Sequence, residues 1–150
     1  MNFPLEALIT LSSHVETYSA AQTQSLAAEF ADNLAPGDVV ALVGELGSGK
    51  TVFARGVIAA LTGTDAVFQG SPTFALVQEY DAGAFPLYHF DFYRIERAAE
   101  LHAIGWEDYL ANQGVIMVEW ADRFPELLPS DARWVEFEVQ DADTRIITME

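Results

Sequence analysis

Runs of apolar residues, separated by Gly, Pro and short polar stretches, divide the chain into strands and helices. Short runs rich in β-branched residues at 39–43 (VVALV) and 115–118 (VIMV) predict strands that are buried on both faces of a sheet. After Lys50, apolar positions recur at helical spacing, which predicts a helix that closes at Gly63. A strand, a Gly-rich turn and a helix are therefore expected to follow one another around Gly44.

The other segments predict hairpins and further helices. Ser19 and Gln22 have the spacing of a capping box, which indicates a helix from there to about Leu34. Extended runs joined by short polar or Gly-containing connections predict two β-hairpins, 74–80 with 85–90 and 134–140 with 145–149. We also expect a short strand at 7–11 and short helices at 96–104 and 106–111. There is no repeat, low-complexity tract or linker, so we expect one α/β domain over residues 1–150.

Composition and charge narrow the range of functions. The chain has no Cys, which excludes disulfides, thiolate metal sites and Cys nucleophiles. It carries 7 Lys and Arg against 23 Asp and Glu, for a net charge of -16. Strong direct binding to nucleic acid draws on clustered Lys and Arg, so we do not expect it here. No stretch approaches the ~20 apolar residues of a membrane span and no signal-like N-terminus is present, so we expect a cytoplasmic protein without a membrane anchor.

Residues 44–51 read GELGSGKT and match the phosphate-binding loop (P-loop) pattern. Gly44, Gly47 and Gly49 allow backbone N–H groups to approach and surround an anion, and the following helix adds its positive end. Lys50 supplies a charge to the outer phosphates, and the Thr51 hydroxyl is suited to a Mg²⁺ ion that bridges them. Because Lys50 is the only lysine, an Asn-Lys-x-Asp guanine motif is impossible, which disfavours a GTPase.

A P-loop also needs an acidic residue at the end of a neighbouring strand. Glu119 follows the VIMV run, and we favour it as the metal-side residue; Asp91 follows another apolar run, and we expect it to position the attacking water. Thr73, in the segment SPTF, either senses the γ-phosphate from a mobile loop or belongs to a plain turn, and the spacing leaves both open. The three His residues are isolated, and we expect them in packing or surface roles rather than as metal ligands.

Five motifs, GELGSGKT, SPTF, YHFDFYR, the pair Ile104-Gly105, and VEW, occur in this order between roughly Ser19 and Arg123. With them, the chain resembles the bacterial TsaE (YjeE) family of small ATPases in tRNA threonylcarbamoyladenosine (t6A) biosynthesis. The resemblance implies a three-layer α/β P-loop NTPase domain with a mixed, partly parallel sheet. The departures at Glu45, Ser48 and Phe92 remove no proposed ligand.

The resemblance also implies the cofactors ATP and Mg²⁺ and a set of site residues. ATP phosphates are expected on residues 46–51, which adds Leu46 and Ser48 to the motif residues, and Mg²⁺ on Thr51 and Glu119. A switch-like loop is expected at residues 71–74, together with a functionally required Asp91. Less directly, the resemblance also implies that residues 19–23 lie near the adenosine and that Arg145 lies near the nucleotide.

The function that the resemblance implies is that of an accessory ATPase for the modification of adenosine 37 in tRNAs. Its expected partners are the threonylcarbamoyl transferase subunit (TsaD) and the inactive paralogue of that subunit (TsaB). Two alternatives remain open on the residues alone. One is a P-loop small-molecule kinase, in which Arg94 and Arg97 clamp the transferred phosphate, and the other is a nucleotide-gated binding module without significant turnover.

Overall fold

Seven strands form one mixed sheet in the computed structural model, which describes residues 13–150. The strands are β1 (Ser13–Thr17), β2 (Val39–Gly44), β3 (Val77–Asp81), β4 (Pro86–Asp91), β5 (Val115–Glu119), β6 (Arg133–Val139) and β7 (Arg145–Met149). Their order in the sheet is β1-β7-β6-β2-β5-β4-β3. The four central strands run parallel, and antiparallel partners flank them on both sides. The strand expected at residues 7–11 lies outside the described residues.

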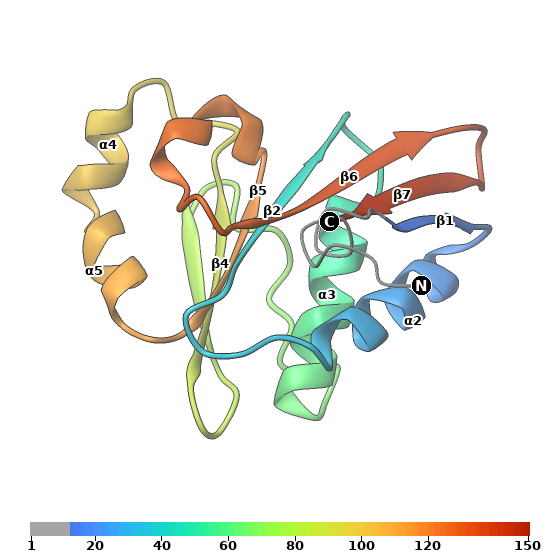
Figure 1. Ribbon diagram of the computed structural model, residues 1–150, viewed down its shortest axis with the longest axis horizontal. Coiled ribbons are helices and arrows are strands. Elements are labelled where there is room, and N and C mark those ends of the chain that lie inside the picture. Colours follow the sequence, from blue (N-terminus) through green and yellow to red (C-terminus); the bar gives the residue numbers. More distant parts are fainter. Residues whose placement is uncertain (1–12) are drawn as a thin grey trace, which may run out of the picture.

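Helices cover both faces of the sheet. They are α2 (Ala20–Ala31), α3 (Lys50–Thr62), α4 (Ala98–Ala103) and α5 (Trp106–Ala111), followed by the 3₁₀ turns η1 (Ala121–Arg123) and η2 (Pro125–Leu127). Helices α2 and α3 lie on one face, and α4 and α5 lie on the other (Figure 1). The predicted three-layer α/β architecture with a partly parallel sheet is therefore confirmed. Within residues 13–150, no helix combines the length and the apolar character that crossing a membrane requires.

Strand β2 shows how the apolar runs give rise to the layers. Val40 and Leu42 point into the core beneath α2 and α3, whereas Val39 and Ala41 point into the core beneath α4 and α5. Successive side chains of a strand alternate between faces, so a strand that is covered twice must be apolar at every position. Strand β5 has the same character and is buried along its whole length, as predicted.

The segment 74–76 was predicted as strand and is a turn instead. The Leu76 N–H donates to the Pro72 carbonyl (2.7 Å), and Leu76 has a positive φ of 71°. Strand β3 therefore begins at Val77, and the side chain of Phe74 is 82% exposed. The hydroxyls of Ser71 and Thr73 bond to the carboxylate of Asp91, and the Leu76 carbonyl accepts from the Asp91 N–H (3.1 Å), so this segment is held as a turn beside the end of β4.

Helix α2 starts as predicted, with a different detail at its cap. Ser19 Oγ accepts from the Gln22 N–H (3.1 Å), but the Gln22 side chain accepts from the N–H of Tyr18 (2.7 Å) rather than from that of Ser19. The helix ends at Ala31, three residues before the predicted end. The turn that follows is closed by a hydrogen bond from the Leu34 N–H to the carbonyl oxygen of Ala31, three residues earlier. Helix α4 likewise starts two residues later than predicted.

Candidate nucleotide-binding site

The P-loop joins the end of β2 to the start of α3. Gly47 (φ 79°) and Gly49 (φ 108°) have left-handed backbone conformations that side chains strongly disfavour. At Gly44 the restriction is one of space, because a Cβ atom there would lie 2.5 Å from Ser48 Oγ and 2.8 Å from the Phe137 carbonyl oxygen. The three glycines of the motif are thus required by the geometry of the loop.

Lys50 is the first residue of α3, and its side chain folds back over the loop. Its Nζ donates to the carbonyl oxygens of Gly44 (2.5 Å) and Glu45 (2.8 Å) and lies 4.2 Å from the centre of the Trp120 ring. Burial lowers the pKa of Lys50 below its ordinary value, and the nearby negative charges, that of Glu119 foremost, act in the opposite direction. The cation is thus held at the inner side of the loop.

Glu119 ends β5, which neighbours β2 in the sheet, and its register partner on β2 is Leu42. This places the carboxylate beside the start of α3, where Thr51 Oγ1 donates to Glu119 Oε1 (2.7 Å). A hydroxyl and a carboxylate oxygen side by side are hard oxygen ligands of the kind that Mg²⁺ takes. Residues 13–150 contain no group of three or more His, Cys, Asp or Glu placed for a metal. The two oxygens would supply part of the shell of a Mg²⁺ ion, and phosphates and water would have to complete it.

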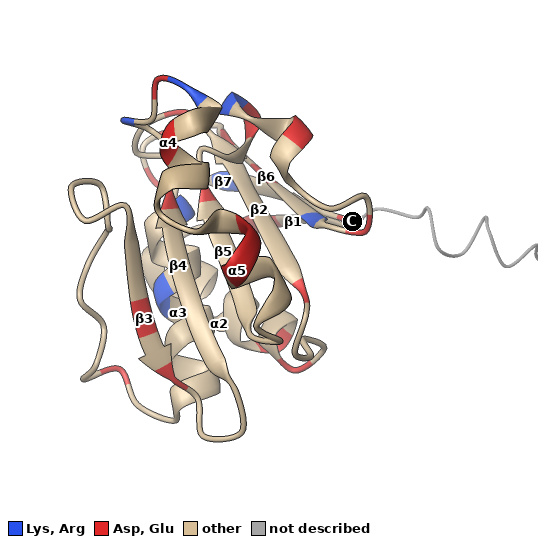
Figure 2. Cartoon of the chain, turned by 90° about the vertical axis from the view of Figure 1, so that its left-hand side faces the viewer, with Lys and Arg blue, Asp and Glu red and all other residues tan. Residues whose placement is uncertain are grey.

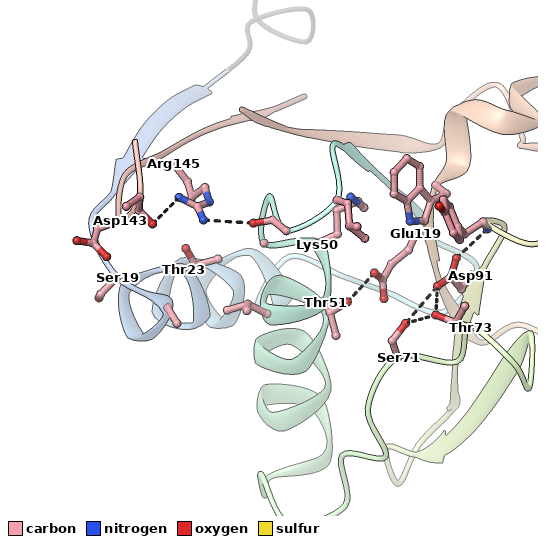
Figure 3. Close-up of a pocket in the computed structure, with 18 residues that line it drawn as sticks. Ser19, Thr23, Lys50, Thr51, Ser71, Thr73, Asp91, Glu119, Asp143 and Arg145 are labelled. Carbon is pink, nitrogen blue, oxygen red and sulfur yellow. Dashed lines mark hydrogen bonds between the residues drawn. The ribbon is translucent and has the colours of Figure 1, made fainter. Parts of the chain in front are cut away.

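Asp91 ends β4 and lies directly opposite Glu119 in the register of the two parallel strands. Its Oδ2 accepts from Ser71 Oγ (3.1 Å) and Thr73 Oγ1 (2.9 Å), and its Oδ1 accepts from the Tyr93 N–H (2.8 Å). Figure 3 shows this group next to the Thr51–Glu119 pair. The segment with Thr73 is therefore tied to the strand that carries Asp91, and the role of Thr73 as a γ-phosphate sensor stays a prediction.

A cavity of about 570 Å³ connects these groups. The predicted site residues that line it are Leu46, Gly47, Gly49, Lys50, Thr51, Thr73, Asp91, Glu119 and Arg145. Arg145 comes from β7 at the far side of the cavity, and its Nη2 donates to the Gly47 carbonyl (3.2 Å) (Figure 3). The cavity also reaches the start of α2, where Ser19 and Thr23 line it, as expected for the segment 19–23.

Two of the predicted site residues, Gly44 and Ser48, shape the loop without lining the cavity. The side chain of Ser48 is buried, and its N–H donates to the Glu45 carbonyl (3.0 Å). In this conformation, Ser48 thus supports the fold of the loop.

Sequence reasoning did not predict the contact between His89 and Glu119. His89 is completely buried, in line with the packing role expected for it, and its Nε2 also lies 2.6 Å from Glu119 Oε2, a contact that was not predicted. The spacing held a signal, because His89 precedes Asp91 by two residues, and residues two apart on a strand share a face.

The family model described as "Threonylcarbamoyl adenosine biosynthesis protein TsaE" matches residues 17–147. The chain belongs to the TsaE family. The match extends past Arg123, where the motifs end, and includes Arg145 on β7. The family therefore connects the chain to the biosynthesis of threonylcarbamoyladenosine in tRNA.

Individual relatives agree with the family match. The chain is 39% identical over 132 residues to the tRNA threonylcarbamoyladenosine biosynthesis protein TsaE of Bacillus subtilis. The aligned part makes up 88% of this chain and 81% of the relative. The TsaE protein of Rickettsia prowazekii is 37% identical over 131 residues, or 87% of this chain and 90% of the relative. The crystal structure of Bacillus subtilis YdiB matches with a TM-score of 0.77 and 33% identity, over 93% of this chain and 84% of YdiB. This likeness supports the P-loop NTPase fold.

Proposed function

We propose that the chain is a cytoplasmic, Mg²⁺-dependent protein that binds and hydrolyses ATP and is required for the threonylcarbamoyl modification of adenosine 37 in tRNAs. Its targets are the transferase subunit TsaD and the paralogue TsaB. One observation carries the proposal: Thr51 of the P-loop forms a hydrogen bond with Glu119 at the carboxyl end of β5, and Asp91 lies beside Glu119 at the carboxyl end of β4. These are the parts that a P-loop ATPase requires, and the family supplies the connection to t6A.

Each part has a role in phosphate binding. The N–H groups of residues 46–51 and the positive end of α3 receive the phosphates of ATP. Lys50 exchanges its bonds to the loop carbonyls for bonds to the outer phosphates. Thr51 and Glu119 would hold the Mg²⁺ ion, which neutralises charge on the phosphates when bound.

The water that attacks the γ-phosphate is oriented by Asp91 at the end of β4. Asp91 is buried beside Glu119, and its carboxylate accepts hydrogen bonds from two hydroxyls of the SPTF segment. A carboxylate that is so placed can accept a hydrogen bond from a water and orient it toward the γ-phosphate. When the phosphate is present, Thr73 exchanges its bond to Asp91 for one to the phosphate, which links the segment 71–76 to the state of the nucleotide.

The surface around the cavity supports coupling to a protein partner. Leu46 lies at the tip of the P-loop and is 80% exposed, and Phe74 is 82% exposed next to Thr73, which lines the cavity. A protein partner that docks over the cavity would remove both apolar side chains from water, which is favourable. Because both belong to the loops that contact the nucleotide, a partner that covers them senses whether ATP is bound.

The experiment compares the wild-type protein with the Lys50→Ala variant, each alone and with TsaD and TsaB. Phosphate release and t6A formation on tRNA are measured together. We expect Mg²⁺-dependent hydrolysis that the partners stimulate, that sustains repeated t6A synthesis and that Lys50→Ala abolishes. The matched control is Arg55→Ala, because Arg55 lies on the same helix but forms an exposed ion pair with Asp65 (2.5 Å).

Other outcomes distinguish the alternatives. ATP binding without hydrolysis, in which the partners still respond to the nucleotide, would support a binding module. Transfer of the phosphate to a small acceptor, with no response to TsaD and TsaB, would support the kinase. Normal hydrolysis by Lys50→Ala would overturn the assignment of the site.

A further inference from the structure

His89 is a buried polar side chain with one polar contact. It lies on β4, has no exposed surface, and its Nε2 is 2.6 Å from Glu119 Oε2. Within residues 13–150, no group forms a hydrogen bond with its Nδ1. The ring of Phe68 stacks against the imidazole, with 6.5 Å between the ring centres. Among the described residues, the contact with Glu119 is the one hydrogen bond that accounts for an imidazole at this position.

The register of the sheet explains how the two side chains meet. His89 is paired with Met117 and Asp91 with Glu119, so His89 lies one diagonal step from Glu119 on the same face. Helix α3 lies over this face, and Thr51 Oγ1 bonds to the other carboxylate oxygen, Oε1, at 2.7 Å. The two oxygens of Glu119 therefore have separate partners, His89 on the interior side and Thr51 on the side of the P-loop.

Hydrogen-bond chemistry fixes the direction of the contact. An ionised carboxylate can only accept, so both the Thr51 hydroxyl and the His89 Nε2–H donate to it. A Glu side chain has three rotatable bonds, and a donor on one oxygen restricts the direction in which the other oxygen points. The contact with His89 also does not compete with the P-loop, because it uses the oxygen that faces away from Thr51.

We infer that His89 is a positioning residue whose Nε2–H holds Glu119 Oε2, so that Oε1 faces Thr51 and the phosphate-binding loop. The consequence for Mg²⁺ rests on the proposed function, whereas the hydrogen bond does not. Partners of this kind, which orient a metal-binding carboxylate without touching the metal, typically change metal affinity about 10- to 100-fold when they are removed.

Two variants test this role. His89→Phe retains a flat ring but has no donor, and His89→Gln retains an amide donor near the position of Nε2. Binding of a fluorescent ATP analogue is measured with and without Mg²⁺, and thermal unfolding reports whether each variant is folded. For His89→Phe, we expect metal-free affinity within about twofold of the wild type, and a Mg²⁺ concentration for half-maximal effect that is raised about 10- to 100-fold. We expect His89→Gln to recover most of this loss.

Two results in this experiment would overturn the inference. One is a Mg²⁺ titration of His89→Phe that matches the wild type, and the other is a His89→Gln variant as impaired as His89→Phe. A general loss of structure would weaken binding with and without the metal alike, so the selective change separates positioning from packing.

A second measurement needs neither nucleotide nor metal. Imidazole ¹⁵N NMR spectra of the wild-type protein report which ring nitrogen carries the proton, and the signal of His89 is assigned by its loss in His89→Gln. We expect the proton on Nε2 and a signal that shifts in Glu119→Gln. A proton on Nδ1 alone, or a signal that does not respond to Glu119→Gln, would overturn the inference. This test remains decisive even if His89→Phe fails to fold. Failure of the wild type to bind ATP would overturn the proposed function instead, and the NMR result would still decide the role of His89.

Discussion

Glu119 and Asp91 are paired in register at the ends of adjacent strands, but their hydrogen-bond donors differ. Glu119 accepts from Thr51 on the P-loop helix, whereas Asp91 accepts from Thr73 in the segment after α3 and from a backbone N–H that follows β4. One carboxylate is therefore connected to the P-loop helix and the other to the segment that contains Thr73. This difference in contacts supports the division of roles that the sequence predicts.

If this division holds, removing Asp91 should separate binding from turnover. We expect Asp91→Ala to retain Mg-ATP binding and to lose hydrolysis by about 100-fold or more, because a positioned carboxylate contributes at least that much to proton transfer or water orientation. The measurement pairs nucleotide affinity with the rate of phosphate release. Asp65→Ala, which removes an exposed carboxylate, serves as the control. Hydrolysis at the normal rate in Asp91→Ala would remove this residue from the mechanism.

At the scale of elements, the sequence predicted the strand, turn and helix around the P-loop because each position there has a strict requirement. Gly44, Gly47 and Gly49 are needed for space or for backbone conformation, and the flanking apolar runs have clear periods. Strand β1 was not predicted, because Val15 is its one apolar residue and only Thr17 is buried. The segment 74–76 was mistaken for strand, because its apolar run continues into β3 and the Asp91 carboxylate that binds the neighbouring Ser71 and Thr73 hydroxyls is distant in the sequence.

The close packing at Gly44 gives a prediction about the end of β2. We expect Gly44→Ala to lower the free energy of unfolding by about 1–3 kcal/mol, because the new methyl group would overlap Ser48 Oγ and the Phe137 carbonyl and would push β2 away from β6. Urea unfolding measures the change. The double variant with Ser48→Ala removes the nearer of the two atoms and should recover part of the loss. A change below about 0.5 kcal/mol in Gly44→Ala would contradict the crowding argument.

At the scale of the whole molecule, the order of strands brings distant residues to one cavity. Strand β6 pairs with β2, and β7 pairs with β6, which places Arg145 beside the P-loop. Hydrophobic periodicity predicts that a strand exists but contains no information on its neighbours. For this reason the placement of Arg145 came only from the family resemblance, and the contact of His89 with Glu119 was not predicted at all.

The charge of the whole chain also has consequences for its stability. Acidic residues occur along much of the fold and basic residues are few (Figure 2), with a net charge of -16. Such an excess destabilises a compact state by self-repulsion.

We expect the melting temperature, without Mg²⁺ or nucleotide, to rise between about 0.01 M and 0.15 M NaCl, over which the screening length falls from about 30 Å to 8 Å. Tetramethylammonium chloride should raise it by a similar amount, because screening does not depend on a specific cation site. A melting temperature that is unchanged or falls in both salts would show that local pairs, such as Arg55 with Asp65, outweigh the long-range repulsion.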